Sequence, residues 1–464
     1  MKMLRAVASC GIFIALIFQP PLYANQLPQS FTFQGSGLGH GVGMSQFGAR
    51  GQALEGVNAI DILQYYYKDI SVDDVRDDKN LRVNIGHLLT LFSVSTATKS
   101  GKLQLFAGDI KDSSTAKPIK NIPAKSLLNF TLLGSAAIPS ITSTSGVVQQ
   151  LPSGTSWTLR WSGTRYLSGV DSILTFKNGN TSTQYRYGEI QIKLVKVAFI
   201  GYRIEVTNTV RLHDEYLWGI GEMPSSWPFA ALQAQAIAAR SYALNKLGKM
   251  KTACDCDIYG SSQDQAFIGF AKESEAKYGK IWKEAVTSTS VNANSGLVAL
   301  FNSAPISAFY FSSSGGYTES AKNAWGSEVP YTQSVEDFWS LDPSINPKYA
   351  SWNRVISQSA MAAAFDLGDV QSVQILAKRD SGMVTSILGI SSGGTTSTLT
   401  GSVFSSRVNL PSAWFDTQGV TIIDASPTPT PTDSPTVSPS PTSSEETSNP
   451  PTESPSPTPS SSTS

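Results

Sequence analysis

Apolar and polar side chains alternate along much of the segment between Arg82 and Thr207, and this pattern limits the fold more than any other feature of the sequence. A period of two places the apolar side chains on one face of a β-strand. The alternation is clearest in three runs: Leu81–Ile85, Trp157–Trp161 and Ile190–Leu194. Gly, Ser and Asn residues separate such runs, as turns do. We expect residues 76–207 to form an inserted antiparallel β unit.

The strongest helix signal follows this unit. Residues Phe229–Leu247 are rich in Ala, come after Pro228 and precede Gly248, and Ser225 or Ser226 would cap the helix start. Further strands are expected at Gly296–Phe301, Ile306–Phe311, Val370–Gly389 and Thr398–Phe404. The expected fold class is therefore α+β, with a β-rich mixed core, a few helices, the inserted β unit and a disordered C-terminal tail.

Neither end of the chain has the pattern of a folded domain. Residues 1–24 begin with Lys2 and Arg5, continue with an apolar stretch and end in Ala24, which is typical of a cleaved signal peptide. Two alternatives remain open, a lipidated Cys10 and an N-terminal anchor that is not cleaved. Residues 426–464 are almost entirely Ser, Pro and Thr, so this segment is expected to be the disordered tail. Export predicts a secreted protein, extracellular or associated with the cell wall, without a permanent membrane anchor.

Composition excludes several classes of protein. The 35 Lys and Arg residues balance 35 Asp and Glu residues. Binding to nucleic acid or to an anionic membrane surface usually depends on an excess of basic residues, so neither partner is expected. Three Cys and three His among 464 residues exclude a disulfide-rich scaffold and leave little material for a multi-histidine metal centre.

A glycine-rich segment follows a short strand expected at Phe31–Phe33. Five Gly fall within residues 35–43, which indicates a closely packed backbone or positive φ angles. His40 lies in this segment, and Ser45 and Gln46 come at its end, where Ser45 would cap a helix running to about Gly56. A second helix is expected to begin within Ile60–Tyr67.

Glu222 is the leading candidate for a catalytic group. Trp218, Met223 and Trp227 surround it in the sequence, and apolar neighbours raise the pKa of a carboxyl, as a general acid requires. Two structural alternatives remain: Glu222 could cap the helix that follows, or it could pair with Arg240.

Long motifs are similar to those of the SpoIID/LytB family, which comprises stage II sporulation protein D and the amidase enhancers. The similarity covers most of residues 31–70 and 200–423. The motifs are the segments 39–49, 216–244, 264–265, 312–319, 325–326, 330–331 with Asp337, and Phe404 to Leu410. We therefore expect residues 25–75 and 208–425 to build a SpoIID-like domain around the inserted unit.

The resemblance implies action on peptidoglycan. Members of the sporulation branch are lytic transglycosylases, which cleave the glycan between N-acetylmuramic acid and N-acetylglucosamine, and their catalytic glutamate corresponds to Glu222. One carboxyl group can serve this reaction first as acid and then as base. The partner implied is the glycan strand. The amidase-enhancer branch implies an alternative, in which a non-catalytic wall-binding protein stimulates an N-acetylmuramoyl-L-alanine amidase. A secreted adhesin is a third hypothesis.

The order of the motifs departs from that of the sporulation proteins. There the Gly-His-Gly segment follows the motif that corresponds to Phe404–Leu410, whereas here it precedes everything else. A permuted arrangement explains this order if the expected strand Val420–Ile423 lies next to Phe31–Phe33.

Several further residues are candidates for substrate binding, each with a structural alternative such as a turn, a helix cap or a place in the core. They are His40, Ser45, Gln46, Gln235, Arg240, Tyr310, Ser313, Ser314 and Tyr317. Some sporulation homologues hold zinc after the helix that follows the catalytic glutamate. Cys254 and Cys256 are weak zinc candidates here, because no His is near them in the sequence; a disulfide between them is the preferred interpretation. No cofactor is expected.

Overall fold

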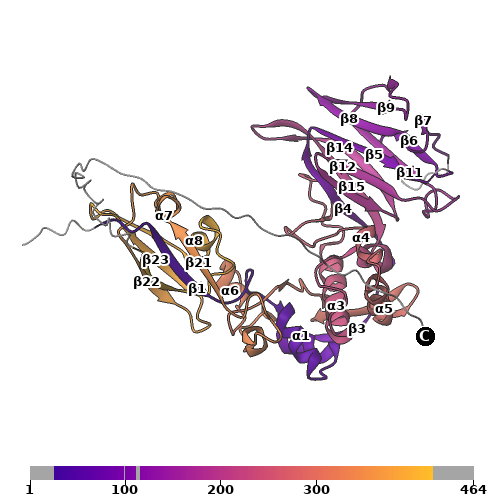
Figure 1. Cartoon of the computed structure of the whole chain (residues 1–464). Coiled ribbons are helices and arrows are strands. Elements are labelled where there is room, and N and C mark those ends of the chain that lie inside the picture. The colour runs from indigo at the N-terminus through magenta and orange to yellow at the C-terminus, as the bar shows by residue number, and fades with distance from the viewer. Residues whose placement is uncertain (1–25, 99, 111–114, 422–464) are drawn as a thin grey trace, which may run out of the picture. The chain divides into compact units, whose positions relative to one another are not determined.

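The computed structural model describes residues 26–98, 100–110 and 115–421 of the chain (Figure 1). The expected signal peptide and the expected C-terminal tail lie outside these residues. Within the described part, no helix has both the length and the hydropathy needed to cross a membrane. The fold is of the α+β class, as the sequence predicts, with 38% of residues in strands and 21% in helices.

Two sheets account for the alternating region. The seven-stranded sheet has the order β16 (Ile258–Tyr259), β4 (Asn80–Leu89), β15 (Gly201–Arg211), β14 (Glu189–Val197), β11 (Ser156–Trp161), β6 (Leu103–Ala107) and β7 (Lys120–Ile122). The six-stranded sheet has the order β10 (Val148–Gln150), β9 (Ala136–Thr142), β8 (Leu127–Leu133), β5 (Leu91–Thr96), β12 (Leu174–Asn178) and β13 (Thr181–Tyr185).

The two sheets pack face to face through the apolar side of each alternating strand (Figure 1). Phe130 of β8 meets Trp157 of β11 edge to face, with ring centroids 5.2 Å apart, and stacks on Phe92 of β5 at 4.9 Å. All strand pairs in these sheets are antiparallel except β16–β4, which is parallel. Through β16, residues that follow the main helix join the sheet of the inserted unit.

The main helix, α3 (Phe229–Lys246), lies at the centre of the next layer. Its Ala-rich surface is buried, which lets its neighbours approach closely. These neighbours are α1 (Gln46–Leu54), α2 (Ala59–Tyr66), α5 (Gly279–Ser288) and β18 (Ser295–Phe301). Strand β18 pairs with β3 (Ser71–Arg76), β17 (Ser290–Asn292) and β19 (Ala304–Pro305). The remaining short elements here are α4 (Phe270–Glu273), α6 (Ala321–Trp325), η1 (Leu212–Tyr216), η2 (Leu217–Gly219) and η3 (Phe338–Leu341).

A separate small core unites the two ends of the described chain. Strand β1 (Ser30–Gly35) lies between β21 (Trp352–Ser357) and β25 (Phe415–Thr421), antiparallel to both. A second sheet of β22 (Ser372–Lys378), β23 (Val384–Ile390) and β24 (Thr396–Leu399), with α7 (Gln358–Phe365) and α8 (Gly401–Arg407), belongs to the same region. Phe33 packs against Phe404 and Phe415 at 5.3 and 5.7 Å between ring centroids.

This pairing confirms that the strand expected near Val420 lies beside the N-terminal strand. Val420 is opposite Phe31 and Thr417 is opposite Phe33. Ile422 and Ile423 lie outside the described residues. The permuted motif order thus requires no long connection, because β1 and β25, near the two ends of the described chain, are adjacent strands.

Three expectations were wrong in detail. Only Tyr310–Phe311 of the strand expected at Ile306–Phe311 is extended in a sheet, as β20. Thr398–Phe404 is half helix, because the Thr400 hydroxyl accepts from the Val403 N–H and caps α8. Neither expected serine caps α3; Pro228 is its N-cap and makes no side-chain bond.

The glycine-rich segment has the backbone that its composition predicts. Gly37, Gly39, Gly41 and Gly43 all have positive φ, between 79° and 110°. Beyond it, strand β2 (Met44–Ser45) runs parallel to β20, and Ser45 caps α1 by accepting from the Gly48 N–H. The glycine-rich segment therefore leads, through β2, into helix α1 next to Tyr310.

Gly48 in α1 has no room for a side chain. A Cβ atom there would lie 1.9 Å from the Tyr66 hydroxyl and 2.0 Å from Oδ1 of Asp337. Both groups are buried and hydrogen-bonded to each other at 2.8 Å, so neither can move without breaking that bond.

We expect Gly48→Ala to lower the free energy of unfolding by about 1–3 kcal/mol, because the clash exceeds the gain of up to about 1 kcal/mol in helix propensity. Gly368→Ala is the matched control, since a Cβ there meets open space. Urea unfolding followed by circular dichroism measures both variants. Equal stability of the two would contradict the packing described.

Candidate functional site

Glu222 lies on a short antiparallel ladder just before α3. Ile220 forms an isolated bridge with Phe267, the Gly221 N–H donates to the Ala266 carbonyl at 2.8 Å, and the Ile268 N–H donates to the Gly219 carbonyl at 2.8 Å. A Cβ atom on Gly221 would lie 2.7 Å from Ile268, so the two segments touch. The backbone around Glu222 is thus fixed on both sides.

The Glu222 carboxyl is half-buried and hydrogen-bonded. Its Oε1 accepts from the Ala266 N–H at 2.5 Å, and the Tyr310 hydroxyl also bonds to it. Burial raises the pKa of Glu222, and the bonds from Ala266 and Tyr310 lower it in part. The ion pairs of the described residues do not include Glu222, and its expected alternatives, capping α3 and pairing with Arg240, are not the contacts it makes.

A chain of hydrogen bonds extends from this carboxyl into the core. Gln265 donates from Nε2 to the Tyr310 hydroxyl at 2.9 Å, and Tyr216 donates to Gln265 Oε1 at 2.8 Å. Burial and the nearby Glu222 charge raise the pKa of both Tyr310 and Tyr216, so both phenols stay protonated. Tyr310 can therefore donate its proton in a hydrogen bond to the Glu222 carboxylate.

Gln46, at the end of the glycine-rich segment, contacts Glu222 and Gln235. Its Nε2 donates to the backbone carbonyl of Glu222 at 3.2 Å and to Oε1 of Gln235 at 3.1 Å. Gln235 is fully buried in α3, and its Nε2 has no partner among the described residues. Three distant parts of the chain, the segments around Gln46, Glu222 and Tyr310, therefore meet at one residue, Glu222.

His40 lies on the other side of Tyr310. Its Nδ1 accepts from the Val42 N–H at 3.1 Å, which favours the neutral ring although part of His40 is exposed. The Phe311 and Trp325 rings are 5.6 and 5.2 Å away, and this enclosure lowers the pKa of His40 to about 4. The residue lines a hollow of about 470 Å³ together with Trp325 and Arg379.

Three candidate serines are buried rather than lining an open surface. Ser45, Ser313 and Ser314 are fully inaccessible to solvent. Ser314 donates to Asp337 Oδ2 at 2.6 Å, and Ser45 lies 2.9 Å from the Ser340 hydroxyl. Ser45 and Ser314 therefore belong to the hydrogen-bond network of Asp337, whereas Ser313 accepts from the Asn346 amide at 2.8 Å.

Two other candidates have partners away from Glu222. Arg240 is fully buried, and its Nε donates to Asp77 at 2.7 Å. Asp77 also binds His213 Nδ1 at 2.6 Å. Tyr317 is exposed and donates to Glu336 at 2.8 Å. The indole rings expected at Glu222 also have other neighbours, since Trp227 packs on Phe47 at 4.9 Å and Trp218 on Tyr187 at 5.5 Å.

Comparison with known proteins identifies part of this site. Residues 201–293 match the family model described as SpoIID, stage II sporulation protein. This part of the chain is a SpoIID domain. It contains Glu222, α3 and Gln265, whereas His40, Gln46 and Tyr310 lie outside the match.

The chain is distantly homologous to two kinds of curated protein. The amidase enhancer of Bacillus subtilis (strain 168) is 33% identical over 140 residues, which cover 30% of this chain and 16% of that protein. Stage II sporulation protein D of the same organism is 33% identical over 144 residues, covering 29% of this chain and 40% of that protein. The chain therefore spans less than half the length of these relatives. No solved structure matches it.

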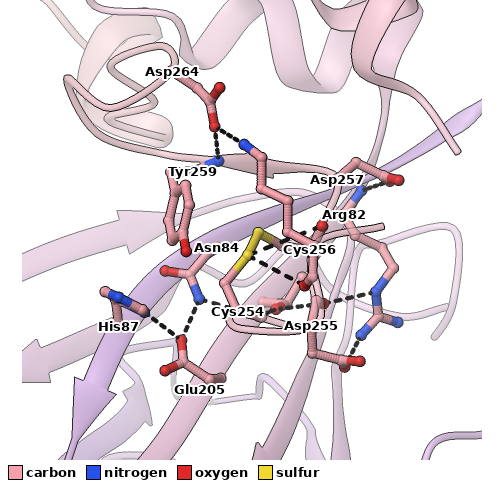
Figure 2. Close-up of a disulfide and its surroundings, with 12 residues drawn as sticks. Arg82, Asn84, His87, Glu205, Cys254, Asp255, Cys256, Asp257, Tyr259 and Asp264 are labelled. Carbon is pink, nitrogen blue, oxygen red and sulfur yellow. Dashed lines mark hydrogen bonds and ion pairs between the residues drawn. A yellow bond between two sulfur atoms is a disulfide. The ribbon is translucent and has the colours of Figure 1, made fainter. Parts of the chain in front are cut away.

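A disulfide joins Cys254 and Cys256 in the SpoIID domain, as the preferred interpretation of the sequence predicts (Figure 2). The residues do not fit a zinc ion, because both sulfur atoms are in the disulfide and Asp255 pairs with Arg82 and Lys193. The described residues contain no group of three or more His, Cys, Asp or Glu side chains placed to hold a metal ion.

Sequence reasoning assigned no role to Gln265, Ala266 or Asp77. The pair Asp264–Gln265 is one of the motifs, and that was the signal available for Gln265. A backbone donor such as the Ala266 N–H leaves no trace in the sequence. Asp77 lies at the end of a strand with many acidic residues, where nothing distinguishes it from its exposed neighbours.

We expect Asp77→Asn to destabilise the protein by about 3–5 kcal/mol, because it leaves the buried Arg240 charge without its partner. Asp74→Asn, on the exposed surface of the neighbouring strand, is the control and should change stability by less than about 0.5 kcal/mol. Thermal unfolding by calorimetry measures the difference. A small effect of Asp77→Asn would show that Arg240 is neutralised in another way.

Proposed function

We propose that this protein is exported and acts on peptidoglycan as a lytic transglycosylase, with Glu222 as the only acid/base. The observation that carries the proposal is the Glu222 carboxyl, whose pKa is raised by burial and whose partners are neutral donors. A group in this state can hold a proton near neutral pH and can still be stabilised after giving it up. The SpoIID domain around it and the distant homology to stage II sporulation protein D support the same reaction class.

The reaction needs one proton donor and returns the proton to it. Glu222 protonates the oxygen that links N-acetylmuramic acid to N-acetylglucosamine, and the bond from C1 to this oxygen breaks. The Glu222 carboxylate then takes the proton from the 6-hydroxyl of the muramic acid, whose oxygen forms the new bond to C1. The product is a 1,6-anhydro sugar, no water is consumed, and Glu222 ends in its protonated state.

The neighbours of Glu222 have positioning roles in this proposal. The Ala266 N–H and the Tyr310 hydroxyl stabilise the carboxylate that forms between the two steps. Gln46 holds the backbone of Glu222 in place, and Gln235 orients Gln46. Neutral His40 hydrogen-bonds to the backbone of Tyr310 and so helps to position that residue.

One observation favours a second function. A relative at 33% identity bears the name amidase enhancer. In this alternative the surface around Glu222 holds the glycan strand without cleaving it, and the partner is an N-acetylmuramoyl-L-alanine amidase whose access to the wall increases.

The variant Glu222→Gln distinguishes the lytic transglycosylase from the amidase enhancer. The amide cannot donate a proton to the glycosidic oxygen, so we expect formation of 1,6-anhydro ends to fall by at least about 100-fold. The full chain and the variant are incubated with glycan strands that lack stem peptides, and the ends are counted by mass spectrometry. Glu284→Gln, an exposed residue of α5, is the matched control and should retain activity. No anhydro product from the unmodified protein, together with faster digestion by an amidase, would support the enhancer instead.

Tyr310→Phe should change the pH dependence. The Tyr310 hydroxyl stabilises the charged form of Glu222 and so lowers its pKa; its removal raises that pKa further. The first step requires protonated Glu222, so activity falls as pH rises through this pKa. The alkaline limb of the kcat/KM profile should therefore move to higher pH in Tyr310→Phe, with a lower maximum. A limb that stays in place or moves to lower pH would exclude Glu222 as the titrating acid.

A further inference from the structure

A second hollow, of about 800 Å³, lies beside the Glu222 ladder and is lined by residues of β4, of β13 and of the segment 259–271. We call it the Tyr259 hollow; its lining includes Asn84, His87, Gln184, Tyr185, Tyr259 and Phe267. A volume in this range is typical of sites that enclose small ligands or parts of larger ones. Nothing in the proposed reaction uses these residues.

The hollow and Glu222 are joined by one short segment of the chain, residues 266–268. Ala266 donates its N–H to the Glu222 carboxyl, and the next two residues, Phe267 and Ile268, line the hollow. The same two residues bridge back to Gly219 and Ile220. A polymer bound at Glu222 would therefore have the hollow immediately beside it.

The lining combines aromatic rings with neutral hydrogen-bonding groups. Tyr185 and Phe267 are buried and stack with ring centroids 6.0 Å apart, which makes a flat apolar floor. Tyr259 is partly exposed on the wall, while the Gln184 and Gln263 amides are exposed at the rim. Apolar faces with amides and hydroxyls around them suit a ring that is apolar on its faces and polar at its edge, as a sugar is.

The uncharged lining of the hollow excludes phosphate and carboxylate ligands. The lining residues, all within the described chain, include no Lys, Arg, Asp or Glu, and their one ionisable side chain besides tyrosine is His87. His87 Nδ1 is 2.9 Å from Glu205, a fully buried acid that also accepts from Asn84 at 2.9 Å. A site for phosphate or for the carboxylates of a peptide would need an uncompensated cation.

The wall is held rigidly from behind (Figure 2). The Asn84 amide also donates to the Cys254 carbonyl at 3.4 Å, and the Tyr259 N–H donates to Asp264 at 2.8 Å. The Tyr259 ring contacts His87 edge to face, with centroids 5.1 Å apart. These contacts, together with the bonds of Glu205 to Asn84 and His87, hold the wall in place, and a preformed wall loses little entropy when it binds a ligand.

We infer that the Tyr259 hollow binds uncharged N-acetylated sugar residues of the glycan strand, next to the bond at Glu222. The inference rests on the proposed function and extends it, because it gives the strand a second place of contact away from the reacting bond. Tyr259 provides an aromatic face, and Gln184 and Gln263 donate to hydroxyl or acetamido oxygens.

The test is binding of a pentamer of β-1,4-linked N-acetylglucosamine to the full chain, measured by isothermal titration calorimetry. Gln184→Ala/Gln263→Ala removes two exposed amides, and Tyr259→Ala removes the ring. Each variant should raise Kd about tenfold, the loss expected from about 1.4 kcal/mol of contacts. Gln149→Ala, an exposed glutamine of β10, is the matched control and should leave Kd unchanged. Thermal unfolding verifies that each variant folds. If Tyr259→Ala does not fold, the Kd of Gln184→Ala/Gln263→Ala tests the inference by itself.

Failure of this inference and failure of the proposed function give different results. Unchanged Kd in the amide variant, or no pentamer binding by the unmodified chain, overturns the inference, whether or not anhydro ends form. Weaker binding by the hollow variants supports it even if the unmodified protein makes no anhydro product.

Discussion

A buried carboxylate, Asp337, holds together the segments that carry the candidate site. It is inaccessible to solvent and accepts hydrogen bonds from Tyr66 at 2.8 Å, Ser314 at 2.6 Å and Ser340 at 2.5 Å. Burial raises the pKa of Asp337, and the hydroxyl donors oppose this shift. Because an unpaired buried acid is costly, these hydroxyls cannot separate from it without loss of stability. Through Ser45, Gly48 and Tyr66, this one group fixes helix α1 and hence the position of Gln46.

The chemistry at Glu222 depends on a balance between two opposed effects. Burial favours the protonated carboxyl, whereas the Ala266 N–H and the Tyr310 hydroxyl favour the carboxylate. A carboxyl paired with a guanidinium would lose its proton too readily, and one without donors would hold it too tightly. The chain avoids a guanidinium at Glu222 because Arg240 is paired with Asp77 in the buried core.

The sequence predicts local features of this structure well because local rules determine them. Alternation predicts the strands around Leu81, Trp157 and Ile190, and glycine content predicts the positive φ angles near His40. The site itself is only partly predictable. Glu222 and Gln46 emerge from motifs, but polar residues such as Arg240 and Ser314 are expected at a surface and are instead buried. Their partners lie far along the chain, at Asp77 and Asp337, and no periodicity or spacing indicates such pairs.

Strand β1 leaves the ribosome early, but both of its neighbours, β21 and β25, come from the last part of the described chain. The small sheet around Phe33 therefore cannot form until nearly the whole polypeptide is available, and such non-local pairing folds slowly. Under the export that we propose, this delay would keep the chain able to pass through a translocation channel, because its ends meet only after β25 has been made.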